Sequence, residues 1–279
     1  MERSKSPQNE KAVAFCKLHE RNGAFVIPNP WDKGTAKLLT HLGFEALATT
    51  SAGYAFSAGK PDHAIERAEM MQHVAEIVSA TDLPVSADLG NGFGDAPEVV
   101  AETIQMAASA GLVGASIEDG TADENDPIYS KPHAVERIRA AVKAARALPF
   151  PFTLTARAEN YLCGRPNLTD TIDRLQAYQE AGAEVLYAPG LTSKNDIAAV
   201  VASLKRPVNV LAGIAGLQLN AQQLAEIGVK RISVGSLISR VAISAVLNAG
   251  KEMREQGTFS FAAGAASFRE LNAFFKSAQ

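Results

Sequence analysis

The chain has 279 residues, of which 47% are hydrophobic and 20% charged, the balance of a globular protein that buries a full core. Its formal net charge of −3, without a long basic run, argues against a nucleic-acid-binding surface, which needs clustered lysine and arginine. No apolar stretch reaches the roughly 18 residues of a membrane span, and the polar first ten residues do not resemble a signal peptide, so we expect a cytoplasmic protein without a membrane partner.

Eight short apolar runs alternate with longer segments of helical periodicity. The runs are nearly continuous in valine, isoleucine, leucine and alanine, which is typical of parallel strands covered on both faces. Eight such strands favour a closed (β/α)8 TIM-type barrel, and the GxGxxG turn of dinucleotide-binding sheets does not follow the first run. The runs lie at residues 25–28, 46–49, 84–89, 114–118, 152–158, 185–188, 208–212 and 231–234.

Helix signals fill the segments between the runs. Apolar stripes at helical spacing begin at Met70 and Val100, and each ends about eleven residues later, at Thr81 and Gly111. Asp95 is expected to cap the second of these helices, ahead of Pro97 in its first turn. Ser130 and Pro132 open another helix, and Asn220 with Gln223 has capping-box spacing.

A helix is also expected on each side of the barrel. Residues 10–21 form the N-terminal one and residues 262–277 the C-terminal one, and no linker marks a second domain, so residues 1–279 are read as a single barrel domain. The C-terminal stripe of Phe268, Leu271, Phe274 and Phe275 is too apolar to remain in water. We therefore expect it to pack on the barrel or on a neighbouring subunit.

Polar residues gather at the predicted carboxyl ends of the strands, where barrel enzymes place their catalytic groups. Strand two ends in the small, hydroxyl-rich segment 49–53, strand three carries Asp88 before the glycine-rich loop 90–94, and strand four ends in Glu118-Asp119. Strand five ends near Arg157, followed by Glu159. Crowded carboxylates repel one another, and a hard cation such as Mg2+ would relieve this repulsion. An arginine beside them suits a substrate carboxylate.

Structural interpretations compete with these roles. Asp88 alone could equally cap a helix, Arg157 could be a buried ion-pair partner of Glu118, and the glycines at 90–94 could form a tight loop or a mobile flap. Trp31 could line a pocket or belong to the core. Cys163 follows strand five, but a cysteine without a base beside it is more often inert; the scattered histidines do not suggest zinc.

Taken in order, the strand-end motifs resemble the isocitrate lyase / phosphoenolpyruvate mutase superfamily. The resemblance runs from about residue 26 to residue 246. The segments that carry it are 27–32 (IPNPWD), 50–53 (TSAG), 59–62 (GKPD), 86–94 (SADLGNGFG), 117–119 (IED) and 155–157 (TAR).

This resemblance implies a fold, an assembly and a chemistry. It implies a modified barrel whose C-terminal helix is often swapped onto a neighbouring subunit, in a homo-oligomer, typically a tetramer and otherwise a dimer. It also implies cleavage or formation of a C–C or P–C bond beside a pyruvate-like unit, through an enolate held by Mg2+ and arginine.

The resemblance assigns roles residue by residue. Asp88 corresponds to the direct Mg2+ ligand, and Asp62 and Glu118 to carboxylates that hold the ion mostly through water. Arg157 corresponds to the arginine that grips the oxo acid. The expected substrate-binding set is Thr50, Ser51, Ala52, Gly53, Arg157, Asn209 and Trp31, and the expected catalytic set is Arg157, Glu118, Tyr129 and Glu159, with Tyr129 or Glu159 as the general acid.

Two departures from the family pattern stand out. Gly90 occupies the position of a second carboxylate, which removes one charge from the outer shell of the ion. The loop after strand four, residues 120–130, has neither cysteine nor histidine, whereas the isocitrate and methylisocitrate lyases carry a Lys-Lys/Arg-Cys-Gly-His loop there. A standard isocitrate lyase is therefore not expected.

The leading hypothesis is a Mg2+-dependent lyase or decarboxylase that cleaves a C–C bond in a small 2-oxo or 2-hydroxy dicarboxylate through a pyruvate-type enolate. One alternative is P–C chemistry, as a phosphonopyruvate mutase or hydrolase. Another is an α-oxo acid binding protein with little catalysis, and the plainest is a barrel whose strand-end charges only pair with one another.

Overall fold

The computed structural model describes residues 6–121 and 123–277. The chain forms two compact units, residues 1–236 and residues 237–279. Among the described residues, no helix is both long enough and apolar enough to cross a membrane.

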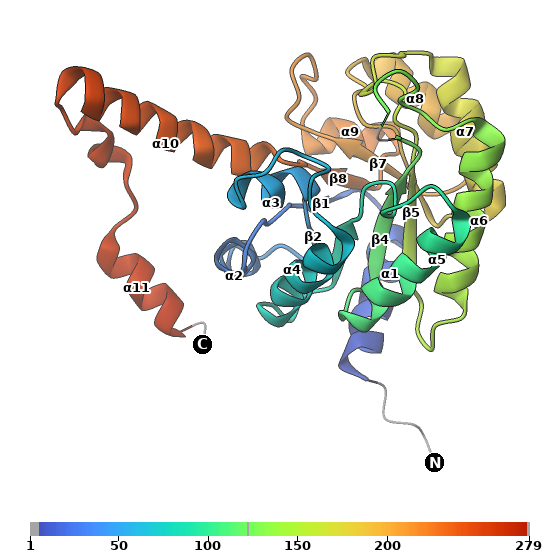
Figure 1. The fold of residues 1–279 in the computed structure, drawn as a ribbon, viewed down its shortest axis with the longest axis horizontal. Coiled ribbons are helices and arrows are strands. Elements are labelled where there is room, and N and C mark those ends of the chain that lie inside the picture. The colour runs from blue at the N-terminus through green and yellow to red at the C-terminus, as the bar shows by residue number, and fades with distance from the viewer. Residues whose placement is uncertain (1–5, 122, 278–279) are drawn as a thin grey trace. The chain divides into compact units, whose positions relative to one another are not determined.

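The first unit is an α/β barrel, as the sequence predicts (Figure 1). Eight parallel strands run in the order β1-β8-β7-β6-β5-β4-β3-β2, and each lies inside the run expected for it. A hydrogen bond from Ala48 N to Pro28 O (3.1 Å) links β2 to the end of β1. The strands are β1 (Phe25–Ile27), β2 (Leu47–Ala48), β3 (Val85–Asp88), β4 (Gly114–Glu118), β5 (Thr153–Arg157), β6 (Val185–Tyr187), β7 (Val208–Leu211) and β8 (Arg231–Ser233).

Asn29 completes this closure from the motif that follows β1. Its side-chain amide donates to Thr49 O (3.1 Å) beyond β2, and its carbonyl accepts from Val234 N and Gly235 N (both 2.9 Å) beyond β8. One buried side chain therefore ties the ends of three strands together at the mouth of the barrel.

Helices follow the strands and cover the outside of the barrel. The capping box of Asn220 and Gln223 is confirmed at the start of α9, and Ser130 occupies the cap position of α6. The predicted Asp95 cap is wrong: Ala96 precedes α5, and the Asp95 carboxylate instead accepts a hydrogen bond from Tyr129. The covering helices are α2 (Lys33–His41), α3 (Ser51–Ser57), α4 (Arg67–Ser79), α5 (Pro97–Ser109), α6 (Lys131–Arg146), α7 (Leu168–Ala181), α8 (Lys194–Ala202) and α9 (Ala221–Ile227).

The N-terminal helix α1 (Pro7–Glu20) packs its apolar side against the start of β1. Phe15 is fully buried beside Phe25, and both belong to a cluster with Ile27 and Val113. Gln8 Nε2 donates to Ala108 O (2.8 Å), in the last turn of α5. Helix α1 therefore closes the end of the barrel opposite the carboxyl ends of the strands.

Side chains alternate along the strands in a way that separates core from cavity. Ala87, Ile117, Leu154, Ala156 and Ile232 are buried apolar residues. Polar neighbours of all of them except Leu154 line the interior cavity, namely Ser86, Asp88, Ser116, Glu118, Arg157, Arg231 and Ser233, and Ala87 borders the cavity as well.

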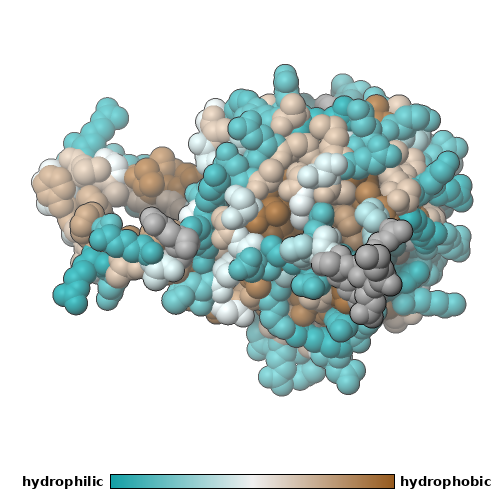
Figure 2. All heavy atoms as spheres, turned by 90° about the horizontal axis from the view of Figure 1, so that it is seen from below, coloured by the Kyte–Doolittle hydropathy of each residue, from teal (hydrophilic) through white to brown (hydrophobic). Residues whose placement is uncertain are grey.

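The second unit consists of α10 (Leu237–Gln256), the 3-10 helix η1 (Ser260–Gly264) and α11 (Phe268–Ser277). The expected helix at 262–277 therefore begins six residues late, because residues 265–267 leave helical geometry after η1. Figure 2 shows apolar residues on the surface of this unit. Large side chains are exposed there, among them Val246 (72%) and Phe268 (85%).

Candidate active site

A cavity of about 360 Å³ opens at the carboxyl ends of the strands. Its walls come from the ends of β1 to β8 and from the segments that follow them, the usual place for an active site in this architecture. The expected residues Thr50, Ser51, Ala52, Asp62, Asp88, Glu118, Arg157, Glu159 and Asn209 all line it.

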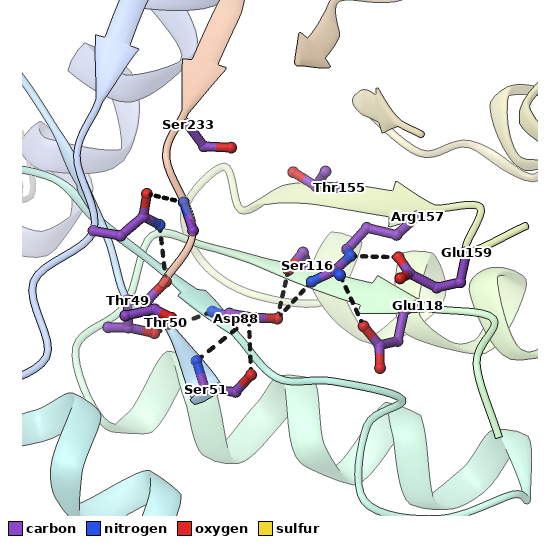
Figure 3. Close-up of polar contacts among 12 residues, drawn as sticks. Thr49, Thr50, Ser51, Asp88, Ser116, Glu118, Thr155, Arg157, Glu159 and Ser233 are labelled. Carbon is purple, nitrogen blue, oxygen red and sulfur yellow. Dashed lines mark hydrogen bonds and ion pairs between the residues drawn. The ribbon is translucent and has the colours of Figure 1, made fainter. Parts of the chain in front are cut away.

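Arg157 at the end of β5 holds three carboxylates (Figure 3). Its Nη1 lies 2.9 Å from Asp88 Oδ1 on β3, its Nη2 3.1 Å from Glu118 Oε2 on β4, and its Nε 2.8 Å from Glu159 Oε1 in the loop after β5. Strand pairing explains part of the arrangement, since Glu118 and Arg157 are register partners. The guanidinium group is thus fixed in orientation by partners from three directions.

Asp88 also receives hydrogen bonds from the start of α3. Ser51 donates to Asp88 Oδ2 through its backbone N–H (3.3 Å) and its hydroxyl (3.0 Å). Thr50 caps the helix by accepting from Gly53 N, so Ser51 sits in its first turn. Asp62 joins this group, because its Oδ1 lies 3.4 Å from the Ser51 hydroxyl.

The carboxylates differ in how easily they ionise. Burial opposes ionisation of Asp88, but Arg157 and the two Ser51 donors outweigh it and hold the pKa of Asp88 below its usual range. Burial raises the pKa of Glu118 well above its usual range; Arg157 offsets part of this, and Glu159, Asp88 and Asp62 add to it. Burial likewise raises the pKa of Glu159. One guanidinium group therefore compensates this set of carboxylates incompletely.

This excess of negative charge bears on the expected Mg2+. Within the described residues, no three Asp, Glu, His or Cys side chains converge into a ready-made cation site. The donors nevertheless fit a hard ion, because Asp88, Asp62 and Glu118 offer only oxygen and carry more charge than Arg157 offsets. A Cβ added at Gly90 would lie 3.8 Å from Glu118 Oε1, so this position borders the same group of charges.

Three expected site residues lie elsewhere. Tyr129 donates to Asp95 and accepts from Asn91, outside the residues that line the cavity. Trp31 donates its backbone N–H to Thr35 at the start of α2, and Gly53 is buried within α3. Neither is part of the cavity wall.

Asp119, next to Glu118, is buried outside the cavity wall. It is 3% exposed and accepts from Tyr178 Oη (2.5 Å), Arg174 Nη1 (3.0 Å) and the backbone N of Glu159 (2.8 Å). The last of these bonds fixes Glu159 next to the cavity. Of the pair Glu118-Asp119, therefore, only Glu118 faces the cavity.

The glycine-rich loop 90–94 is held rather than free. Arg137 on α6, which is 1% exposed, donates to the carbonyls of Asn91, Gly94 and Asp95 and lies over the ring of Tyr129 (4.3 Å). Three carbonyls on one buried guanidinium favour the tight-loop interpretation over a flap.

The cavity also contains residues that sequence reasoning did not select. Arg231 on β8 and Tyr187 on β6 lie at inward positions, while His63 stands beside Asp62 with a positive φ of 64°. The alternation of polar and apolar residues in the strands was the available signal for Arg231. His63 follows directly from the motif that contains Asp62.

Comparisons with known proteins find relatives with the same fold. The family model described as phosphoenolpyruvate phosphomutase matches residues 15–254. A crystal structure of a Burkholderia cenocepacia J2315 protein, provisionally described as a lyase/mutase, is 59% identical, with a TM-score of 0.94 over 96% of both chains. An oxaloacetate acetylhydrolase in complex with its product oxalate is 25% identical, with a TM-score of 0.85 over 96% of this chain and 94% of that one.

Among curated relatives, 2-methylisocitrate lyase from Halalkalibacterium halodurans (strain ATCC BAA-125 / DSM 18197 / FERM 7344 / JCM 9153 / C-125) is 29% identical over 208 residues, which cover 72% of this chain and 67% of that protein. The two solved structures share the fold of this chain, and the family model spans most of its length. The chain belongs to the phosphoenolpyruvate phosphomutase family, within the isocitrate lyase / phosphoenolpyruvate mutase superfamily.

Proposed function

We propose that this chain is a Mg2+-dependent lyase that cleaves a C–C bond in a small 2-oxo or 2-hydroxy dicarboxylate through a pyruvate-type enolate. The observation that carries the proposal is the guanidinium of Arg157, fixed by Asp88, Glu118 and Glu159 at the mouth of the barrel. A fixed cation stabilises charge that develops during a reaction without having to reorganise. The named activities of the relatives support the same chemistry.

Substrate binding falls to β2 and the start of α3. The residues Thr50, Ser51 and Ala52 line the cavity, and their hydroxyl and backbone groups suit a carboxylate, although the N–H groups of Ser51 and Gly53 already donate to Asp88 and Thr50. Arg157 would orient the oxo group from the opposite side. The substrate is thus held between a neutral anion-binding turn and a charged guanidinium group.

Mg2+ would be held by Asp88, with Asp62 and Glu118 contributing from nearby. When bound, it supplies a positive charge that polarises the oxo group of the substrate. The raised pKa of Glu118 fits this role, because Arg157, which Glu118 shares with Asp88 and Glu159, offsets only part of the effect of burial.

Glu159 is the proton donor in this proposal. It lines the cavity, is 4% exposed, and its pKa is raised by burial, so it holds a proton to higher pH than a free glutamic acid. Its Oε1 accepts from Arg157, which leaves Oε2 to carry that proton. Tyr129, the other expected donor, is engaged with Asp95.

The loop after β4 supports an activity other than that of a standard isocitrate lyase. Residues 120–130 lack the cysteine of those lyases, and Gly120 pairs with Ile128 in a short bridge. Cys163 lines the cavity from another loop, but burial raises the pKa of its thiol to about 11. The protonated thiol is a poor nucleophile.

The exposed apolar side chains of α10 and α11 support a homo-oligomer. Patches of this kind on a soluble protein mark interaction surfaces. We propose that they are covered in the assembled protein, with the C-terminal helix packed on a neighbouring subunit.

Thermal unfolding with oxalate, a mimic of the pyruvate enolate, tests the proposed chemistry. Oxalate with Mg2+ at about 100 times its Kd should stabilise the protein by roughly 2.7 kcal/mol, and neither oxalate alone nor the Asp88→Asn variant should show this shift. A panel of oxaloacetate, 2-methylmalates and phosphonopyruvate should then give turnover of a C–C substrate. Turnover of phosphonopyruvate alone would reassign the chain to P–C chemistry, and binding without any turnover to a binding protein.

A further inference from the structure

We propose that Arg231 is a specificity residue that binds a second acidic group of the substrate at the inner end of the cavity. The inference rests on the proposed function and names the residue that recognises the second carboxylate of the proposed dicarboxylate substrate.

Arg231 lies at the end of a row of register partners that crosses five strands. Register pairs connect Glu118 to Arg157, Arg157 to Tyr187, Tyr187 to Asn209 and Asn209 to Arg231. Because the strands of a closed barrel are staggered, a row of register partners also moves along the barrel axis. All five residues line the same cavity, so the row leads from the carboxylate cluster at the mouth to Arg231.

Two hydrogen bonds hold the side chain of Arg231. Among the described residues its side chain donates to two neutral acceptors, Nε to Asn209 Oδ1 (2.9 Å) and Nη2 to Thr155 Oγ1 (2.9 Å). Its Nη1 is buried and has no hydrogen-bond partner among the described residues. These two bonds fix the plane of the guanidinium group and leave Nη1 unpaired within the described part of the chain.

The positive charge of Arg231 is buried. Arg231 is 5% exposed, and it forms no salt bridge within residues 6–121 and 123–277. Burial lowers its pKa to about 10; Tyr187 raises it in part, and the positive charge of Arg157 lowers it. Arg157, by contrast, holds three carboxylates. A buried cation without an anionic partner is costly, and an acidic group of a ligand would remove this cost.

The volume of the cavity limits the size of the ligand. A cavity of about 360 Å³ is at the small end of ligand sites and suits a molecule of a few carbon atoms. Tyr187 separates the two cations, with Arg157 5.2 Å from the centre of its ring. A short diacid could therefore place one end at Arg157 and Ser51 and the other at Arg231.

Binding of matched ligand pairs tests the proposal. The probes are 2-oxoglutarate against 2-oxovalerate and oxaloacetate against 2-oxobutyrate, in which a carboxylate replaces a methyl group, titrated calorimetrically with Mg2+ present. Wild type should bind each diacid at least 10-fold more tightly than its partner, as expected for a charge-assisted hydrogen bond. Arg231→Gln should reduce this preference to about twofold or less while leaving oxalate and monoacid affinities within about twofold.

Two further variants act as controls. Arg231→Lys keeps the charge and should retain part of the preference. Lys230→Gln removes a neighbouring charge outside the cavity wall, where Lys230 Nζ donates to Arg21 O (2.8 Å), and should behave as wild type.

The outcomes separate this inference from the proposed function. Absence of a diacid preference in wild type overturns it without any variant, and so does an Arg231→Gln protein that loses all ligands equally or keeps the preference. Oxalate that fails to bind wild type with Mg2+ sinks the proposed enolate chemistry. A diacid preference that depends on Arg231 would still stand in that case.

Discussion

Ser51 donates both its backbone N–H and its hydroxyl to one oxygen of Asp88, at 3.3 and 3.0 Å. The two donors come from the first turn of α3, and Asp88 ends β3, so a helix and a strand meet at a single carboxylate oxygen. The other oxygen of Asp88 faces Arg157 and Ser116. Asp88 is thus fixed in position by four donors before any ligand binds.

Removing the Ser51 hydroxyl should weaken the site without destroying it. In Ser51→Ala the backbone N–H still contacts Asp88, so we expect the affinity for oxalate and Mg2+ to fall about 3- to 10-fold, as for one lost hydrogen bond. Ser57→Ala on the same helix, where the hydroxyl donates to Tyr54 O, is the matched control. Equal effects of the two changes would show that the Ser51–Asp88 contact is unimportant.

Replacing Arg157 should expose the repulsion that it now offsets. Arg157→Met leaves Asp88, Glu118 and Glu159 buried without their cation, and we expect a loss of about 3–5 kcal/mol at neutral pH. Without the guanidinium group, the folded-state pKa values of Glu118 and Glu159 rise further above their unfolded values, and Asp88 loses the main charge that now lowers its pKa. The loss of stability relative to wild type should therefore grow as pH rises and shrink as pH falls from 8 to 5.5. Urea unfolding of both proteins at several pH values measures it; a penalty independent of pH would contradict this account.

Arg137 should decide whether the loop 90–94 stays in place. Arg137→Met removes the donors to three loop carbonyls, so hydrogen exchange in residues 91–95 should accelerate and the protein should lose about 2 kcal/mol or more. Arg139→Met, at an exposed position on the same helix, controls for the loss of charge. Unchanged exchange in the loop would mean that its own turns, with Phe93 at a φ of 66°, suffice to hold it.

Acid should destabilise the barrel through His19. Burial lowers the folded-state pKa of His19 to about 3, with a further contribution from Arg231, against 6.5 for a free imidazole. The unfolded chain therefore takes up a proton below pH 6.5 that the folded protein refuses, and stability is lost as pH falls from about 6.5 to about 3. The expected loss is about 2 kcal/mol between pH 7 and pH 5.

The variant His19→Phe keeps the aromatic contacts with Phe15 and Phe25 and cannot titrate. It should flatten the acid limb of a stability curve measured by denaturant unfolding from pH 4 to pH 7. The same slope in both proteins would place the sensitivity elsewhere, for example at His73, where burial also lowers the pKa, to about 4.

The C-terminal unit should control assembly. Val246→Asp and Phe268→Asp each place a charge at an exposed apolar position, and we expect them to shift the protein to a smaller species in light scattering after size exclusion. Lys251→Asp, on the exposed part of α10, changes charge without removing apolar surface. A monomeric wild type would end the proposal that the unit mediates assembly.

The strands and the mouth of the cavity were predictable because they depend on local patterns. Residues 86–88, 116–118 and 155–157 alternate polar with apolar, and each ends in a charged residue. Since parallel strands end on one face, Asp88, Glu118 and Arg157 had to lie near one another. Their pairing through a single arginine depends on rotamers and register, which periodicity does not encode.

The contacts that the sequence pattern did not predict also have physical causes. Asp95 has the spacing of a helix cap, but Tyr129 and Arg137 compete for its carboxyl and carbonyl groups from 34 and 42 residues away in sequence. The role of Arg231 depends on the stagger of five strands around the barrel. Asp119 is adjacent to Glu118 in sequence, yet alternation turns it toward Arg174 and Tyr178.

Helix α1 has a consequence for traffic through the barrel. It closes the end opposite the mouth, with Phe15 and Phe25 buried there and Gln8 and Lys11 bonded to the backbone at Ala108 and Thr81. A molecule in the cavity is therefore expected to enter and leave at the carboxyl ends of the strands. For any cleavage that yields two fragments, the fragment nearer the mouth would have to leave first, and the deeper fragment would stay bound until it has gone.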